Sequence, residues 1–251
     1  MRRLGLLIAV LAAAGLVVGA EAGAEISGKR ARAFAAELAA LGPRVAGTAT
    51  EGMAADLVAE EFRELGYRVR RQAVRLPEGG VSRNVVARSP ARPRAIVVAH
   101  LDGVSGTVAA NDNGSGVAVM LEVARALAGT PGVLFAAVGA EERVESGSPT
   151  HLGSAKLSRV LPERVRDGIR LALSLDMVGV GARLEVRGIE PRPNRSARLV
   201  LEVAASRGVR TRYAPDTGVS DHAELTRAGV PAAWIQYRFD AACWHRPCDT
   251  A

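Results

Sequence analysis

Apolar residues recur along the chain at two spacings, which predict alternating helices and strands. Apolar positions three to four residues apart predict helices, and short apolar runs bounded by Gly or Pro predict buried strands. The predicted helices cover residues 30–41, 51–65, 116–129, 195–206 and 220–229, and the predicted strands cover 82–89, 93–100, 132–140, 169–181, 208–215 and 230–237. This alternation predicts an α/β fold, a three-layer α/β/α sandwich whose largely parallel sheet has helices on both faces. We expect a single domain over residues 26–251.

Composition refines this expectation. The 251 residues are 48% hydrophobic but only 4% aromatic, so Ala, Val and Leu must build the core. The net charge of +7 raises the question of nucleic-acid binding. The basic side chains are nearly all arginines spread along the chain, and their densest stretch (Arg63, Arg68, Arg70 and Arg71) has no regularly interleaved aromatics. We therefore interpret the arginines as solvated surface and expect no nucleic-acid partner.

The first 22 residues have the pattern of an export signal. Arg2 and Arg3 precede the apolar run 4–18, and the small residues 20–22 suit cleavage. The run is short for a membrane span, and no cysteine follows it for lipid attachment. We expect a secreted or periplasmic protein without a stable membrane anchor, with an uncleaved anchor as the alternative.

Imidazole and carboxylate side chains follow the predicted strands. His100 and Asp102 come after the apolar run AIVVA, Glu141 and Glu142 after VLFAAVGA, and Asp176 after LALSL. His245 lies in the loop after the last strand, and Asp112 opens the helix that follows the first of these strands. Ligands bind beyond the carboxyl ends of parallel strands, and His with Asp or Glu is the ligand set of a hydrolytic zinc site. Taken singly, each of these residues also fits a cap, a turn or a structural histidine. Their coincidence at matched strand ends favours the metal site.

The same residues carry a family resemblance. The segments HLDGVSGTVAANDNGSGVAVMLEVARAL, AAVGAEE, LGS, LSLDMVG, SDHAELTRAGVPA and WHRPCDT resemble, in order, the motifs of the M28 zinc peptidases, aminopeptidase-like enzymes with two zinc ions. The resemblance spans residues 26–251. It implies a mostly parallel mixed sheet and a metallopeptidase that hydrolyses peptides or small amides, most simply an aminopeptidase; export rests on the first 22 residues alone.

The resemblance also assigns roles. It implies two zinc ions per chain, His100 and Asp176 completing one site, Glu142 and His245 the other, and Asp112 bridging both. Glu141 would be the general base, and Asp102 would accept the second N–H of the His100 imidazole. It further implies a cis peptide bond between Asp112 and Asn113. Asp221 and His222 match a motif near the substrate pocket and are tentative substrate-binding residues.

Two further features stay open. Cys243 and Cys248 are the only cysteines, and in an exported protein they form a local disulfide or remain two free thiols. His151 lies in a link between the glutamate pair and LGS that is longer than usual in the family, and we interpret it as a loop residue.

The sequence departs from the family at several positions. Trp244 and Arg246 flank His245 where Tyr and Thr are usual, Leu225 stands where Phe is preferred, and the closing helix after DT is missing from this sequence. Trp before the last histidine also occurs in the related glutaminyl cyclases, which use one zinc. The alternatives are therefore a glutaminyl-peptide cyclotransferase and a non-catalytic binding module of the same fold.

Overall fold

The computed structural model describes residues 10, 26–142, 147, 149–238 and 241–251. Except for residue 10, the predicted export signal lies outside the described residues. Within the described part of the chain, no helix is long and apolar enough to cross a membrane.

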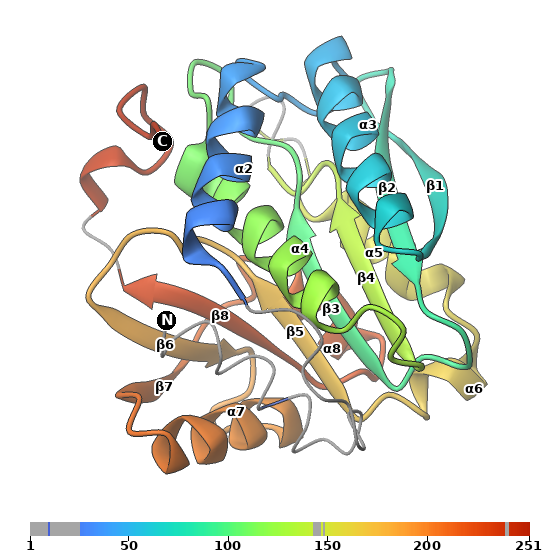
Figure 1. Ribbon diagram of the computed structural model, residues 1–251, viewed down its shortest axis with the longest axis vertical. Helices are drawn as coiled ribbons and strands as arrows, with labels where there is room; N and C mark the ends of the chain where they lie inside the picture. Colours follow the sequence, from blue (N-terminus) through green and yellow to red (C-terminus); the bar gives the residue numbers. More distant parts are fainter. Residues whose placement is uncertain (1–9, 11–25, 143–146, 148, 239–240) are drawn as a thin grey trace.

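One eight-stranded sheet forms the centre of the molecule, and helices cover both of its faces (Figure 1). The strands are β1 (Arg68–Arg75), β2 (Val81–Arg88), β3 (Ala95–His100), β4 (Val133–Val138), β5 (Leu171–Leu175), β6 (Arg183–Gly188), β7 (Thr211–Pro215) and β8 (Ala232–Arg238). The helices are α2 (Gly28–Ala40), α3 (Ala49–Glu64), α4 (Gly116–Ala126), α5 (Leu152–Val160), α6 (Glu163–Arg166), α7 (Arg195–Ser206) and α8 (His222–Arg227), with short helices η1 (Ala110–Ser115) and η2 (Ala241–Cys243). The predicted three-layer α/β/α arrangement is confirmed.

The sheet is mixed, with a parallel centre. Its strand order is β1-β2-β4-β3-β5-β8-β6-β7. Strands β4, β3, β5 and β8 run parallel to one another, as do β6 and β7, whereas β1 with β2, β2 with β4 and β6 with β8 pair antiparallel. The carboxyl ends of the four central strands therefore meet at one edge of the sheet.

Side-chain alternation along β3 divides the core between the two faces. Val97 and Ala99 belong to the larger apolar cluster, which lies under α2, α3, α4 and α7, while Ile96 and Val98 belong to the smaller one under α5 and α8. Because successive side chains on a strand point to opposite faces, His100 follows Ile96 and Val98. The fold thus directs His100 toward the face covered by α5 and α8.

The hydrophobic pattern does not single out two of the strands. β1 carries four arginines, is mostly exposed and pairs only with β2, so it lacks the apolar run of a buried strand. β6 alternates charged and apolar residues, and its Glu185 is buried because it forms an ion pair with Arg212. Tertiary pairing, rather than local hydrophobicity, defines both strands.

Candidate metal centre and active site

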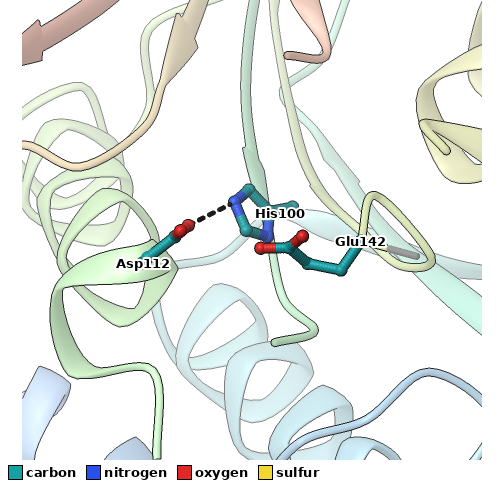
Figure 2. Close-up of side chains that lie close together, drawn as sticks. All are labelled: His100, Asp112 and Glu142. Atoms are coloured by element: carbon teal, nitrogen blue, oxygen red, sulfur yellow. Dashed lines mark ion pairs between the residues drawn. The ribbon is translucent and has the colours of Figure 1, made fainter. Parts of the chain in front are cut away.

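The predicted metal-ligating side chains converge at the carboxyl edge of the sheet. His100 is the last residue of β3, Asp176 directly follows β5, and Glu142 follows β4 within the loop that begins at Gly139. These three strands are neighbours in the sheet, so their ends bring the side chains together. Figure 2 shows Asp112, from η1, directed at the imidazole of His100, with the Glu142 carboxylate beside the same ring.

Asp112 lies between two histidines. Its Oδ1 is 3.1 Å from Nε2 of His100, and its Oδ2 is 3.2 Å from Nε2 of His245. Nε2 of His100 is also 3.4 Å from Oδ1 of Asp176, and Nε2 of His245 is 2.9 Å from Oε1 of Glu142. The side chains therefore form two groups that share the Asp112 carboxylate.

The electrostatics of the cluster favour cations. Burial alone would lower the pKa of His100, but the surrounding carboxylates raise this pKa well above its usual value. Burial also lowers the pKa of His245, but Asp112 and Glu142 raise it to about 10. Oδ1 of Asp176 is buried and accepts no hydrogen bond, since its contact with Nε2 of His100 at 3.4 Å lacks hydrogen-bond geometry. Carboxylate and imidazole groups with an orphaned buried oxygen fit a zinc site, because zinc takes N and O ligands of this kind.

Proximity alone does not separate the two glutamates. Ligand atoms of His100, Asp112 and Glu142 lie within 4.8 Å of one another, and so do those of His100, Glu141 and Asp176. Burial raises the pKa of Glu141 well above its usual value, and the neighbouring Glu142 adds to this effect against the opposing His100. A raised pKa is typical of a carboxylate that accepts a proton near neutral pH.

Asp102 is placed differently from the sequence prediction. Its backbone carbonyl oxygen, rather than its carboxylate, is the partner of Nδ1 of His100, at 3.2 Å. The nearer carboxylate oxygen is 3.9 Å from Nδ1, too far for a hydrogen bond. The two carboxylate oxygens instead accept the backbone N–H groups of Glu141, at 3.1 Å, and of Glu142, at 2.9 Å. Asp102 thus fixes both His100 and the segment that carries the glutamate pair.

The small residues after Asp112 permit a tight return of the chain. The peptide bond between Asp112 and Asn113 is cis, as the resemblance implies. The Asn113 side chain donates to the Leu175 carbonyl at 2.9 Å and accepts the N–H of Gly116 at 2.9 Å. A Cβ at Gly116 would lie 2.2 Å from Oδ1 of Asn113, so this position requires glycine. Close packing of α4 against the end of β5 therefore holds Asp112 near His100.

Two supporting residues were not singled out by the sequence patterns. The Asp249 carboxylate accepts the backbone N–H groups of Asn111, at 2.7 Å, and of Asp112, at 3.0 Å. Arg44 is fully buried and donates to the carbonyl oxygens of Val108 and Ala109. For Arg44 the interpretation of the arginines as solvated surface is wrong, because the backbone carbonyls of the loop before Asp112 supply its partners.

His245 belongs to a short closed loop. The structure has Cys243 and Cys248 joined by a disulfide, with Cα atoms 5.2 Å apart. Trp244 is about half exposed, and its ring centroid lies 4.3 Å from that of His245. The disulfide restricts the conformations of the segment that presents the His245 ring to Asp112 and Glu142.

Asp221 and His222 are both fully buried beside the cluster. Nε2 of His222 lies 3.1 Å from Oδ2 of Asp216, and its ring packs near Trp234. Burial raises the pKa of Asp221 to about 7. Their preceding neighbour Ser220 donates to Oδ2 of Asp176 at 2.8 Å. Both side chains are buried, so neither exposes surface through which it could contact a substrate directly.

A match to a known protein family assigns the chain to its family. The family model described as "Peptidase family M28" matches residues 84–251, more than half of the chain. The chain belongs to peptidase family M28. The matched segment contains every residue of the cluster, from His100 to His245.

Two relatives that are described as aminopeptidases support this placement. The chain is 33% identical over 176 residues to the probable lipoprotein aminopeptidase LpqL of Mycobacterium tuberculosis, a match that covers 61% of this chain and 34% of LpqL. It is also 33% identical over 147 residues to aminopeptidase YwaD of Bacillus subtilis, which covers 55% of this chain and 30% of YwaD. The chain thus spans about a third of the length of these curated relatives.

Solved structures with the same fold include two kinds of enzyme. The zinc aminopeptidase BSAP of Bacillus subtilis matches with a TM-score of 0.80 and 20% identity, covering 90% of each chain. A glutaminyl cyclase of Porphyromonas gingivalis matches with a TM-score of 0.76 and 25% identity over the same 90% of each chain. These likenesses confirm the mixed α/β architecture of the zinc aminopeptidases.

Proposed function

We propose that this M28 protein is an exported, zinc-dependent aminopeptidase that holds two zinc ions per chain and hydrolyses the N-terminal bond of peptides or small amides. One observation carries the proposal: the two oxygens of Asp112 face the Nε2 atoms of two different histidines, at 3.1 Å and 3.2 Å. A carboxylate shared in this way suits two ions, with Asp176 completing the His100 group and Glu142 the His245 group.

Zinc bound by these groups would lower the pKa of a coordinated water to about 7 and polarise the carbonyl group of the substrate. In the proposal, Glu141 accepts the proton of the attacking water and passes it to the leaving amine. Asp102 holds the glutamate pair through the two backbone N–H groups. Ser220 orients the Asp176 carboxylate through its hydroxyl group.

The test is a combined metal and product analysis of the purified protein. We expect about two zinc ions per chain, hydrolysis of aminoacyl anilides with a free amino group, and no hydrolysis of the same compounds after N-acetylation. Loss of hydrolysis on chelation and its return with added zinc would support the metal requirement. Zinc binding without turnover of any aminoacyl amide would contradict the aminopeptidase and favour a binding module.

A glutaminyl-peptide cyclotransferase is the second candidate. It is supported by the likeness to glutaminyl cyclases and by Trp244 before His245. This candidate predicts one zinc ion per chain and release of ammonia from peptides with N-terminal glutamine. The shared Asp112 carboxylate favours the peptidase.

Export of the protein is predicted by its first 22 residues. We expect a mature N-terminus near Gly23 and recovery of the protein outside the cytoplasm of its native host. N-terminal sequencing of material from cell fractions measures both. Intact Met1 on protein confined to the cytosolic fraction would contradict export.

Asp249 provides a prediction on metal affinity. In Asp249→Asn, an NH₂ group replaces one of the two carboxylate oxygens that accept the N–H groups of Asn111 and Asp112. One of these hydrogen bonds is therefore lost, and Asp112 is held less firmly. Loss of such an outer partner of a metal ligand typically costs 10- to 100-fold in affinity, and we expect a decrease of about this size here. Competition with a chromophoric chelator measures it. Thr250→Ala is the control, because Thr250 is exposed and adjoins Asp249, and neither N–H group that Asp249 accepts comes from it.

A further inference from the structure

His151 lies against the proposed general base, although the sequence suggested a plain loop residue. It immediately precedes α5 and is only 8% exposed. Its Nε2 atom is 3.1 Å from Oε1 of Glu141, within hydrogen-bonding distance. The proposed aminopeptidase mechanism assigns no role to this ring.

The backbone holds the two residues together. The N–H of His151 donates to the carbonyl oxygen of Glu141 at 2.9 Å, and the N–H of Leu152 donates to that of Ala140 at 2.8 Å. These bonds join the start of α5 to the segment that follows β4. The approach of the imidazole to Glu141 therefore follows from a fixed backbone pairing.

Close contact between Gly153 and Gly139 makes this pairing possible. A Cβ at Gly153 would lie 2.2 Å from the carbonyl oxygen of Gly139, so no larger residue fits there. The buried Asn84 side chain also bridges the two segments, donating to Gly153 O at 2.9 Å and accepting from Gly139 N at 3.1 Å. The first turn of α5 is thus clamped to the loop that carries Glu141.

The surroundings of the ring determine its hydrogen-bonding capacity. Burial lowers the pKa of His151, so the ring is neutral and carries a single N–H. Oγ1 of Thr150 lies 3.3 Å from Nδ1, where its hydroxyl group can act as the donor. The backbone of Val219 is a further hydrogen-bond partner of the ring. If Nδ1 accepts from Thr150, the proton is on Nε2, which faces Glu141.

We propose that His151 is a positioning residue for Glu141: its Nε2–H donates to Oε1 and fixes the carboxylate, leaving Oε2 to accept the proton of the attacking water. This inference rests on the proposed function, in which Glu141 is the general base. His151 acts through Glu141 and does not touch the substrate or bind metal.

The first test compares two variants of His151. His151→Leu fills similar space without a donor, whereas His151→Gln retains an N–H donor. We expect kcat to fall about 10- to 100-fold in His151→Leu, the usual effect of losing a hydrogen bond to a charged group, while KM and zinc content stay unchanged. His151→Gln should recover part of this loss. Ser158→Ala is the control, because Ser158 is buried on the same helix and its hydroxyl group has no partner.

A double-mutant cycle tests whether His151 acts through Glu141. If it does, adding His151→Leu to Glu141→Gln should lower kcat by less than twofold, because interacting residues are not additive. A full additional 10- to 100-fold loss would overturn the inference. So would a His151→Leu variant with unchanged kcat, with a raised KM at unchanged kcat, or with less bound zinc.

The ring itself gives a measurement that is independent of activity. The chain has four histidines, so ¹⁵N-histidine NMR spectra of the wild type and of His151→Gln identify the His151 signals. We expect the Nε2–H tautomer, and an Nδ1–H tautomer would overturn the inference. If the wild type hydrolyses no aminoacyl amide, the proposed function fails, whereas the Nε2–H tautomer would still support the pairing with Glu141.

Discussion

Glu141→Gln is expected to lower kcat by about 10²- to 10⁴-fold, the usual contribution of general-base catalysis, while the protein keeps its full zinc content. Glutamine preserves the size of the side chain and an oxygen that accepts a hydrogen bond, but it cannot accept a proton near neutral pH. The burial that raises the pKa of Glu141 prepares the carboxylate for this role. KM should change little because Glu141 acts on the proton rather than on substrate binding.

Steady-state kinetics on an aminoacyl anilide and zinc analysis of the same sample measure this prediction. Glu60→Gln is the matched control, because Glu60 is exposed on α3 and forms an ion pair with Arg63 on the same helix, away from the cluster. An active Glu141→Gln variant would show that this cluster is not the catalytic site.

Glu142→Gln is expected to act on the metal rather than on the proton. Oε1 of Glu142 lies 2.9 Å from Nε2 of His245, so the two side chains belong to one of the two groups. A neutral amide is a weaker zinc ligand than a carboxylate, so this variant should lose about half of its zinc when free zinc is limiting. Activity should fall with the metal and return in part when excess zinc is added.

The comparison of the two variants distinguishes the two glutamates. Loss of metal from Glu141→Gln, together with a loaded but inactive Glu142→Gln, would mean that the two roles are reversed. The comparison is needed because distances alone do not distinguish the two roles: each glutamate belongs, with His100, to a group of ligand atoms within 4.8 Å of one another.

The sequence specified most of the fold through its hydrophobic pattern. The compact apolar runs of β3, β4 and β5 match strands that are buried on both faces, and helical spacing located α4 and α7. The edge strand β1 could not be found in this way. Its arginines lie mostly in solvent, so its pairing with β2 contributes no apolar signal.

The identities of the clustered residues could also be read from the sequence. Parallel strands place their carboxyl ends at one edge, so His100 and Asp176 were expected to meet there. The structure shows this meeting at 3.4 Å. Their assignment to particular ions remains a proposal that the zinc analyses test.

Only the tertiary structure decided the contacts between residues that lie far apart in the chain or in irregular loops. Asp249 holds Asp112 from 137 residues away, and no local pattern indicates such a pairing. The carboxylate of Asp102 accepts two backbone N–H groups rather than the imidazole N–H of His100. The strand ends at His100, so the alternation of side chains along a strand does not predict where the Asp102 side chain points.

The position of His151 has the same physical origin. The sequence shows a histidine in a long polar link, whereas close approach of Gly153 to Gly139 brings its ring to Glu141. The sequence by itself determined which chemical groups stand at the strand ends, because hydrophobic periodicity fixes the strands. The packing of glycines, buried amides and backbone carbonyls decided which of those groups are in contact, because these interactions join segments that are distant in the sequence.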